Sequence, residues 1–168
     1  MPSDSVDVII QQWHDTDPTL DVSAMAIIGR ISRLSRVLDR RLGENFARHG
    51  IDDWMYDVLA TIYRSGEPGE LSPTELVEHT MVTTGAMTNR IDRLAERGLV
   101  TRRHDASDRR RVVVALTDDG RELVERIAPD HYRYEDGLLD TLSETQRAQL
   151  VRSLRALLVG LGDTPPDR

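Results

Sequence analysis

The segment from Leu71 to Leu116 constrains this chain most, because its local signals fix an order of helices and strands. Ser72-Pro73-Thr74-Glu75 contains the serine and glutamate of a capping box, with proline at the first helical position, and predicts the start of a short helix. A second helix is predicted from Thr83 to Arg97, with Gly98 as its C-terminal cap. Its inward face is predicted to carry the apolar residues that recur at helical spacing, Met87, Ile91, Leu94 and Ala95.

The opposite face of the second predicted helix is small and polar. Glycine allows a backbone to approach closely, and free N–H groups at a helix start suit a phosphate. Threonine and asparagine side chains can hydrogen-bond base edges. A solvated helix face without any partner gives the same pattern, so this helix alone does not distinguish a DNA-binding face from a solvated one. The residues of this face are Thr83, Thr84, Gly85, Thr88, Asn89 and Arg93.

Two strands are predicted after this helix, from Leu99 to His104 and from Val112 to Leu116, where apolar and polar residues alternate. The turn between them runs from Asp105 to Arg111 and ends in three consecutive arginines. Arginines at a hairpin tip can enter a minor groove, where the potential is most negative. A charged hairpin directly after two such helices favours a winged helix-turn-helix that binds double-stranded DNA. The wing residues concerned are Asp108, Arg109, Arg110 and Arg111.

The net charge of −7 would by itself argue against a nucleic-acid partner. Its distribution changes that conclusion. Residues 71–116 hold eight arginines and six acidic residues, a charge of +2, which leaves −9 for the rest of the chain. The positive charge is thus concentrated in the predicted DNA-binding segment, and the acidic body would resist unspecific binding.

Apolar helices are predicted on both sides of this segment. A short helix runs from about Ser5 to His14, and a long one from about Val22 to His49. After the wing, Thr117 is expected to cap a helix that Pro129 kinks or interrupts. The last helix begins at the capping box Ser143–Gln146 and carries a leucine stripe, Leu150, Leu154, Leu157 and Leu161.

The fold class is therefore predicted to be mainly α with a small β-hairpin wing. Residues 51–117 would form the winged helix-turn-helix, and residues 163–168 a loose tail. Residues 1–50 and 118–162 would form a helical dimerisation layer, because neither end makes an independent core. A symmetric homodimer would present two DNA-binding units to a palindromic operator.

Several other classes of protein lack support in the sequence. The chain has no cysteine, and its five histidines show no metal-binding spacing. It has no nucleophile elbow, Walker loop or dinucleotide-binding glycine motif, so no enzyme, cofactor or metal is predicted. Without a long apolar run or a signal-peptide pattern, the expectation is a cytoplasmic protein without a membrane partner.

The chain resembles the MarR family of bacterial transcription regulators over nearly its whole length. The most specific segments are LSPTEL, TNRIDRLAERGLV, and DRR followed by a strand and LT. The resemblance implies that the helix from Thr83 to Arg97 enters the major groove. It also implies that Asp108 and Arg110, as the D-x-R pattern of the wing tip, place an arginine in the minor groove.

Within that family, the chain looks most like the urate-responsive branch, which has an extra N-terminal helix. The matching patterns are Trp54-Met-Tyr-Asp57-Val-Leu59, Asn89-Arg90-Ile91 and Gly98-Leu-Val-Thr-Arg102. The resemblance implies an effector site for urate or a similar planar anion, which would displace Asp57 from Arg90. A different small anion or a phenolic compound would suit the same site, and a structural salt bridge of Asp57 with Arg90 or Arg102 is the alternative. The implied effector residues are Trp13, Asp57, Arg90 and Arg102.

Two functions from different classes follow. The first is a ligand-responsive, dimeric transcription regulator, with repression of a palindromic operator as the expected mode. The second is a winged-helix protein-interaction module that does not bind DNA. The arginine-rich wing and the Thr/Asn face favour the first, because a protein-binding face more often exposes apolar residues.

Overall fold

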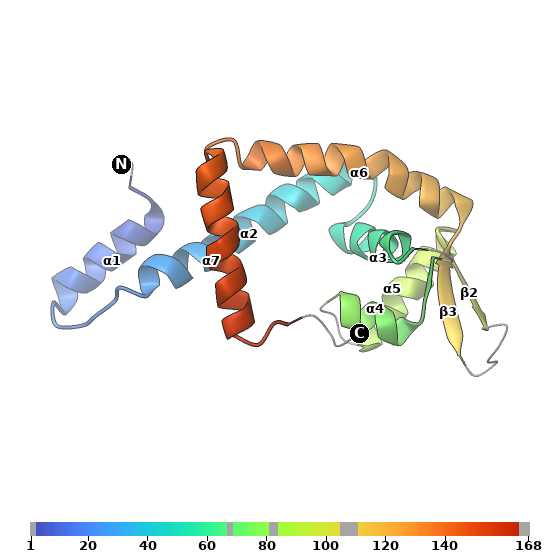
Figure 1. The fold of residues 1–168 in the computed structure, drawn as a ribbon, viewed down its shortest axis with the longest axis horizontal. Coiled ribbons are helices and arrows are strands. Elements are labelled where there is room, and N and C mark those ends of the chain that lie inside the picture. The colour runs from blue at the N-terminus through green and yellow to red at the C-terminus, as the bar shows by residue number, and fades with distance from the viewer. Residues whose placement is uncertain (1–2, 67–68, 81–83, 105–110, 165–168) are drawn as a thin grey trace.

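The computed structural model describes residues 3–66, 69–80, 84–104 and 111–164. The described residues form an α-helical protein with one small sheet (Figure 1). The helices before the sheet's hairpin are α1 (Ser5–Thr16), α2 (Met25–Arg48), α3 (Asp53–Arg64), α4 (Pro73–His79) and α5 (Thr84–Glu96). The strands and the remaining helices are β1 (Glu70–Leu71), β2 (Val100–His104), β3 (Val112–Leu116), α6 (Asp118–Leu138) and α7 (Glu144–Gly160).

The winged helix-turn-helix consists of α3, α4, α5 and the sheet. The predicted hairpin is confirmed, since β2 and β3 pair antiparallel with Val100 opposite Leu116. A third strand, β1, pairs with β3 and makes the strand order β1-β3-β2. The sequence did not predict β1, because two residues are too few to show an alternating pattern.

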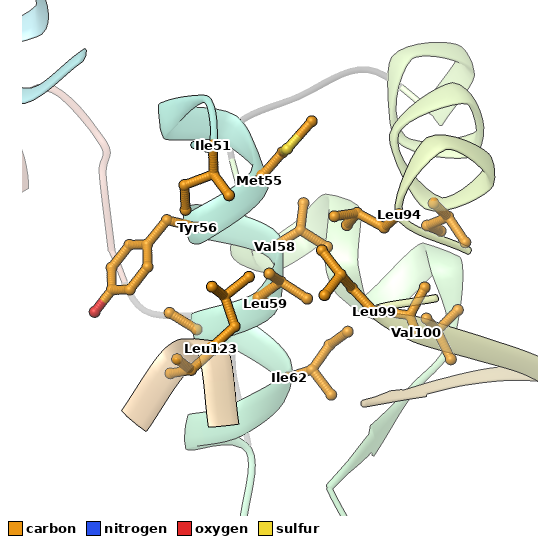
Figure 2. Close-up of a cluster of buried hydrophobic side chains, with 14 of the residues drawn as sticks. Ile51, Met55, Tyr56, Val58, Leu59, Ile62, Leu94, Leu99, Val100 and Leu123 are labelled. Carbon is orange, nitrogen blue, oxygen red and sulfur yellow. The ribbon is translucent and has the colours of Figure 1, made fainter. Parts of the chain in front are cut away.

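The core of this unit forms around α3 (Figure 2). Val58, Leu59 and Ile62 of α3 have no exposed surface. Around them pack side chains from α5, β2, α6 and the connection before β2, among them Leu94, Leu99, Val100 and Leu123. Burial of such side chains contributes about 1.5–3 kcal/mol each, so this cluster fixes α5 and the wing to α3.

Local capping signals predicted the helix starts well. Ser72 and Ser143 each form the predicted capping box, and Thr117 accepts a hydrogen bond from the Gly120 N–H. Of the two predicted effects of Pro129, an interruption does not occur, because α6 continues through this residue from Asp118 to Leu138. Pro129 itself is exposed, whereas Ile127 and His131 on either side are buried.

The remaining helices extend away from the winged helix-turn-helix (Figure 1). Helix α1 packs on α2, and α2 packs on α6. Large apolar side chains are left exposed along α2 and α7, with Ile27 at 62% and Leu161 at 76% exposure. Among the described residues, none of the helices is both long and apolar enough to cross a membrane. The division into a dimerisation layer and a DNA-binding domain stays a prediction.

The start of α6 lies unusually close to the start of β2. The Thr117 N–H donates to the Leu99 carbonyl over 3.1 Å, and the Thr117 hydroxyl donates to the Gly98 carbonyl over 2.7 Å. A Cβ on Gly120 would lie 2.0 Å from the Leu99 carbonyl oxygen. Only glycine therefore fits at this position, where the wing joins the helical arm.

We predict that Gly120→Ala lowers the free energy of unfolding by about 1–3 kcal/mol, because backbone must move to admit the methyl group. Gly137→Ala on the same helix is the matched control. A Cβ there meets nothing within 4 Å, so alanine should raise stability by roughly 0.5–1 kcal/mol. Urea unfolding of both variants measures the difference, and equal stability of the two would contradict the close contact.

Candidate functional site

The outer face of α5 is the first part of the candidate site. Met87, Ile91 and Leu94 are fully buried, so the opposite side of the helix faces solvent as predicted. Gly85, Thr88, Asn89 and Arg93 are exposed on α5, and Thr84 is its first residue. A Cβ on Gly85 would meet nothing within 4 Å, so the surface there is open to an approaching backbone. Thr83 lies outside the described residues.

No large apolar side chain is exposed among the described residues of α5. A face that binds another protein would more often present such side chains. The polar surface of α5 therefore favours a nucleic acid over a protein as its partner.

The base of the wing is held by ion pairs to neighbouring elements. Arg111 lies 3.0 Å from Glu75 of α4, and Arg103 pairs with Glu70 of β1. These pairs are partly exposed, so each contributes at most about 1 kcal/mol to stability. They orient the two strands whose connection carries the predicted minor-groove residues. Of those residues, Asp108, Arg109 and Arg110 lie outside the described residues.

The second part of the candidate site is a cleft of about 470 Å³ between α2, α3, α5 and α6. Asp57 of α3 and Arg90 of α5 both line it, so the structure brings together two of the four predicted effector residues. No ion pair joins Asp57 to Arg90 or to Arg102 among the described residues. The alternative of a structural salt bridge therefore does not describe this conformation.

The electrostatics of the cleft are mixed. Four carboxylates line it, those of Asp39, Asp53, Asp57 and Glu135, against the guanidinium groups of Arg64 and Arg90. Loss of hydration raises the pKa of Asp57, although Arg64 and Arg90 partly oppose this. Burial also raises the pKa of Tyr56 to about 12, so its hydroxyl keeps its proton. The cleft therefore offers two arginines, a protonated tyrosine hydroxyl and a carboxyl group whose pKa is raised.

Trp54 supplies an aromatic wall to this cleft. The guanidinium carbon of Arg90 lies 5.5 Å from the Trp54 ring centre, and that of Arg93 lies 4.7 Å from it. The Trp54 ring N–H donates to Asp52 over 3.0 Å, which fixes the indole orientation. Arg93 also lies 3.8 Å from Asp52. Both arginines of α5 thus contact α3 through one tryptophan.

Comparison with known proteins gives the family. A family model described as MarR family matches residues 49–111. The HTH-type transcriptional regulator PecS of Dickeya dadantii is 37% identical over 150 residues, which cover 89% of this chain and 88% of PecS. The chain belongs to the MarR family. It is a DNA-binding transcription regulator with a winged helix-turn-helix, and it is not an enzyme.

Solved structures with the same fold include a regulator in complex with operator DNA and one whose DNA binding a small acid regulates. Bordetella bronchiseptica BpsR, whose DNA binding is regulated by 6-hydroxynicotinic acid, gives a TM-score of 0.69 at 25% identity. That match covers 78% of this chain and 91% of BpsR. A mutant of Escherichia coli MarR in complex with operator DNA gives a TM-score of 0.71 at 26% identity, covering 87% of this chain and 97% of MarR.

Two of the predicted effector residues of this MarR-family chain do not line the cleft within one subunit. Trp13 is 43% exposed on α1, which lies at the end of the molecule opposite the wing (Figure 1). Arg102 of β2 lies 2.5 Å from Asp92 of α5 and so ties the wing to that helix. Asp57 and Arg90 thus line the cleft together, whereas Arg102 pairs with Asp92 at the base of the wing.

Sequence reasoning missed several residues that line the cleft. Trp54 was not predicted as a site residue, although its spacing of three from Asp57 places both at neighbouring positions on one helix face. Arg64 lies seven residues after Asp57 on the same helix and could have been found in the same way. Tyr132 and Glu135 come from α6, and no local signal connects them to α3.

We predict that Asn89→Ala weakens operator binding by about 1–3 kcal/mol at particular base pairs, because an exposed amide can read a base edge. Gln12→Ala, an exposed amide on α1, is the matched control and should leave binding unchanged. Fluorescence anisotropy with a set of single-base operator variants measures both. A loss of the same size on every operator variant would show that Asn89 contacts only the backbone.

Proposed function

We propose that this regulator is a homodimeric repressor that a small planar anion releases from a palindromic operator. The observation that carries the proposal is the position of Arg90. This residue lies on α5, the helix with the exposed polar face, and also lines the cleft with Asp57. A ligand that engages Arg90 there would bias the orientation of the helix that contacts DNA.

The proposal of a homodimer rests on unpartnered apolar surface. Leu150, Leu154 and Leu157 of α7 are exposed, as are Leu161 directly after this helix and Ile27 and Leu34 of α2. The described part of α7 has no buried residue at all. Exposed apolar faces of this extent mark an interface, and a second copy of the chain offers the same helices with matching symmetry.

We predict a dimer at micromolar concentration in sedimentation velocity, because the leucine face of α7 needs a partner. Leu154→Glu should shift the population towards monomer, since a buried unpaired charge is costly. Glu144→Gln, an exposed change on the same helix, should leave the dimer intact. Dimers of Leu154→Glu as stable as those of the wild type would remove α7 from the interface.

The chemistry of the cleft suits a planar anion that pairs with arginine and also accepts a hydrogen bond from a protonated side chain. Arg64 and Arg90 can hold an anionic edge, and an arginine fork pairs well with a planar carboxylate or urate-like group. Trp54 and Tyr56 offer aromatic surface for stacking. Urate and aromatic acids share these features, and BpsR responds to one such acid, 6-hydroxynicotinic acid.

The other two predicted effector residues, Trp13 and Arg102, would act from outside the cleft of their own chain. Trp13 would reach this cleft only from the partner subunit, because α1 of the same chain packs on α2 far from the wing. Arg102 would act through Asp92, carrying a movement of α5 to the wing.

The contribution of the wing to DNA binding, through Arg110 and Arg111, should depend on the salt concentration, because arginines displace counterions from phosphates.

We predict that anion binding strengthens as the pH falls, because the pKa of Asp57 is raised in the free protein. Protonation removes one negative charge from the cleft and turns Asp57 into a hydrogen-bond donor. Asp57→Asn mimics that state and should bind urate more tightly than the wild type near neutral pH, with a flatter pH profile. Glu122→Gln, exposed on α6, is the matched control for loss of one negative charge.

Calorimetry with urate and with 6-hydroxynicotinic acid measures the anion affinity of each variant. Titration of the operator, followed by anisotropy, measures DNA affinity with and without the anion. If either anion acts as effector, it should lower operator affinity by about 5- to 150-fold, which corresponds to a coupling of 1–3 kcal/mol. Weaker anion binding by Asp57→Asn than by the wild type would show that the ionised carboxylate itself holds the ligand.

A further inference from the structure

Asn45 of α2 is a buried polar residue without a partner. It has no exposed surface, and neither its amide nitrogen nor its carbonyl oxygen makes a hydrogen bond among the described residues. A buried amide left unpaired in this way costs stability. An apolar residue of the same size would avoid that cost, so the presence of asparagine requires an explanation.

Asn45 lines a second cleft, separate from the one that holds Asp57. This cleft has a volume of about 470 Å³ and lies between α2 and α6. Arg41, Asn45 and Arg48 line it from α2, where spacings of four and three place them on one helix face. Arg133 and Tyr134 line it from α6. Arg90, Asp57 and Trp54 do not take part in it.

The charge of this cleft is positive, in contrast to the acidic chain around it. Three arginines line it against one carboxylate, that of Asp130. Asp130 is already engaged, 3.0 Å from His49 and 3.5 Å from Arg133. Arg48 lies over the Tyr134 ring at 5.7 Å. The ion pair that Arg41 makes among the described residues is a long one, 3.9 Å to Glu44. The guanidinium groups therefore keep donors available for an anion.

We propose that the α2–α6 cleft is a binding site for a phosphate group that carries a proton. The arginines supply charge and N–H donors for the phosphate oxygens. Asn45 has no exposed surface in the unliganded chain, so it joins the site when the ligand draws its side chain into the cleft. Its amide then donates to a phosphate oxygen, and its carbonyl accepts a hydrogen bond from the phosphate hydroxyl. One ligand would thus satisfy both unpaired atoms.

The proposed site would distinguish phosphate from ions of similar shape by the proton that phosphate retains. Inorganic phosphate and phosphate monoesters retain a proton in part of the population near neutral pH, whereas sulfate and the phosphodiesters of DNA retain none. Only the former can donate to the Asn45 carbonyl. The free ion and a monoester share this chemistry, and testing each of them separates the two sources.

The test is calorimetric titration of the full-length dimer with inorganic phosphate, glycerol phosphate and sulfate, in a buffer free of these ions. We expect phosphate or glycerol phosphate to bind, and to bind more tightly than sulfate. Arg133→Gln should weaken this binding by roughly tenfold, because a hydrogen bond to a charged group is lost. Arg126→Gln, an exposed change on the same helix, should not affect it.

Asn45→Leu provides the sharper comparison. Without phosphate this variant should be at least as stable as the wild type to thermal unfolding, because it removes two unpaired buried atoms. It should also lose the preference for phosphate over sulfate. Asp57→Asn should retain that preference, which separates this site from the proposed effector cleft.

The proposal is overturned if neither phosphate compound binds, or if sulfate binds as tightly as both. It is also overturned if Asn45→Leu is less stable than the wild type in the absence of phosphate, since Asn45 would then already have a partner in the dimer or in bound water. Failure of urate to act as an effector would leave this inference unaffected, because the two clefts share no residue that lines them.

Discussion

The packing of α3 is the interaction on which the rest of this structure depends. One face of α3 buries Val58, Leu59 and Ile62 completely against α5, the sheet and α6. The flank of the same helix carries Trp54 and Asp57 into the cleft. A single twelve-residue helix therefore fixes the position of α5, the helix predicted to contact DNA, and also forms the floor of the proposed effector site.

This arrangement explains how a small ligand could influence DNA binding without a long pathway. Trp54 contacts Arg90 and Arg93 of α5 directly, and Arg102 joins α5 to the wing through Asp92. A ligand that pairs with Arg90 would directly change the contact between Trp54 of α3 and Arg90 of α5. Exposed, partly hydrated contacts of this kind can be exchanged at modest cost, whereas the buried face of α3 holds the unit together.

The sequence predicted the fold in those parts where local chemistry decides it. Capping boxes at Ser72 and Ser143, and Gly98 with its positive φ, marked helix ends that the structure confirms. Long-range features were not predictable: the strand β1 has no period of its own, and Gly120 is required only because α6 begins against Leu99. Likewise, Asp57 and Arg90 were found through a family resemblance, but Tyr132 and Glu135 reach the cleft from a distant helix.

Reciprocal linkage between the cleft and the operator is the most direct test of coupling through Arg90. Operator affinity is measured with and without saturating anion, and anion affinity is measured with and without operator, for the wild type and for Arg90→Gln. We predict that both ratios are equal in the wild type, because linkage is reciprocal, and that both fall towards unity in Arg90→Gln. An anion that binds the wild type while operator affinity stays unchanged would contradict the claim that Arg90 couples the two sites.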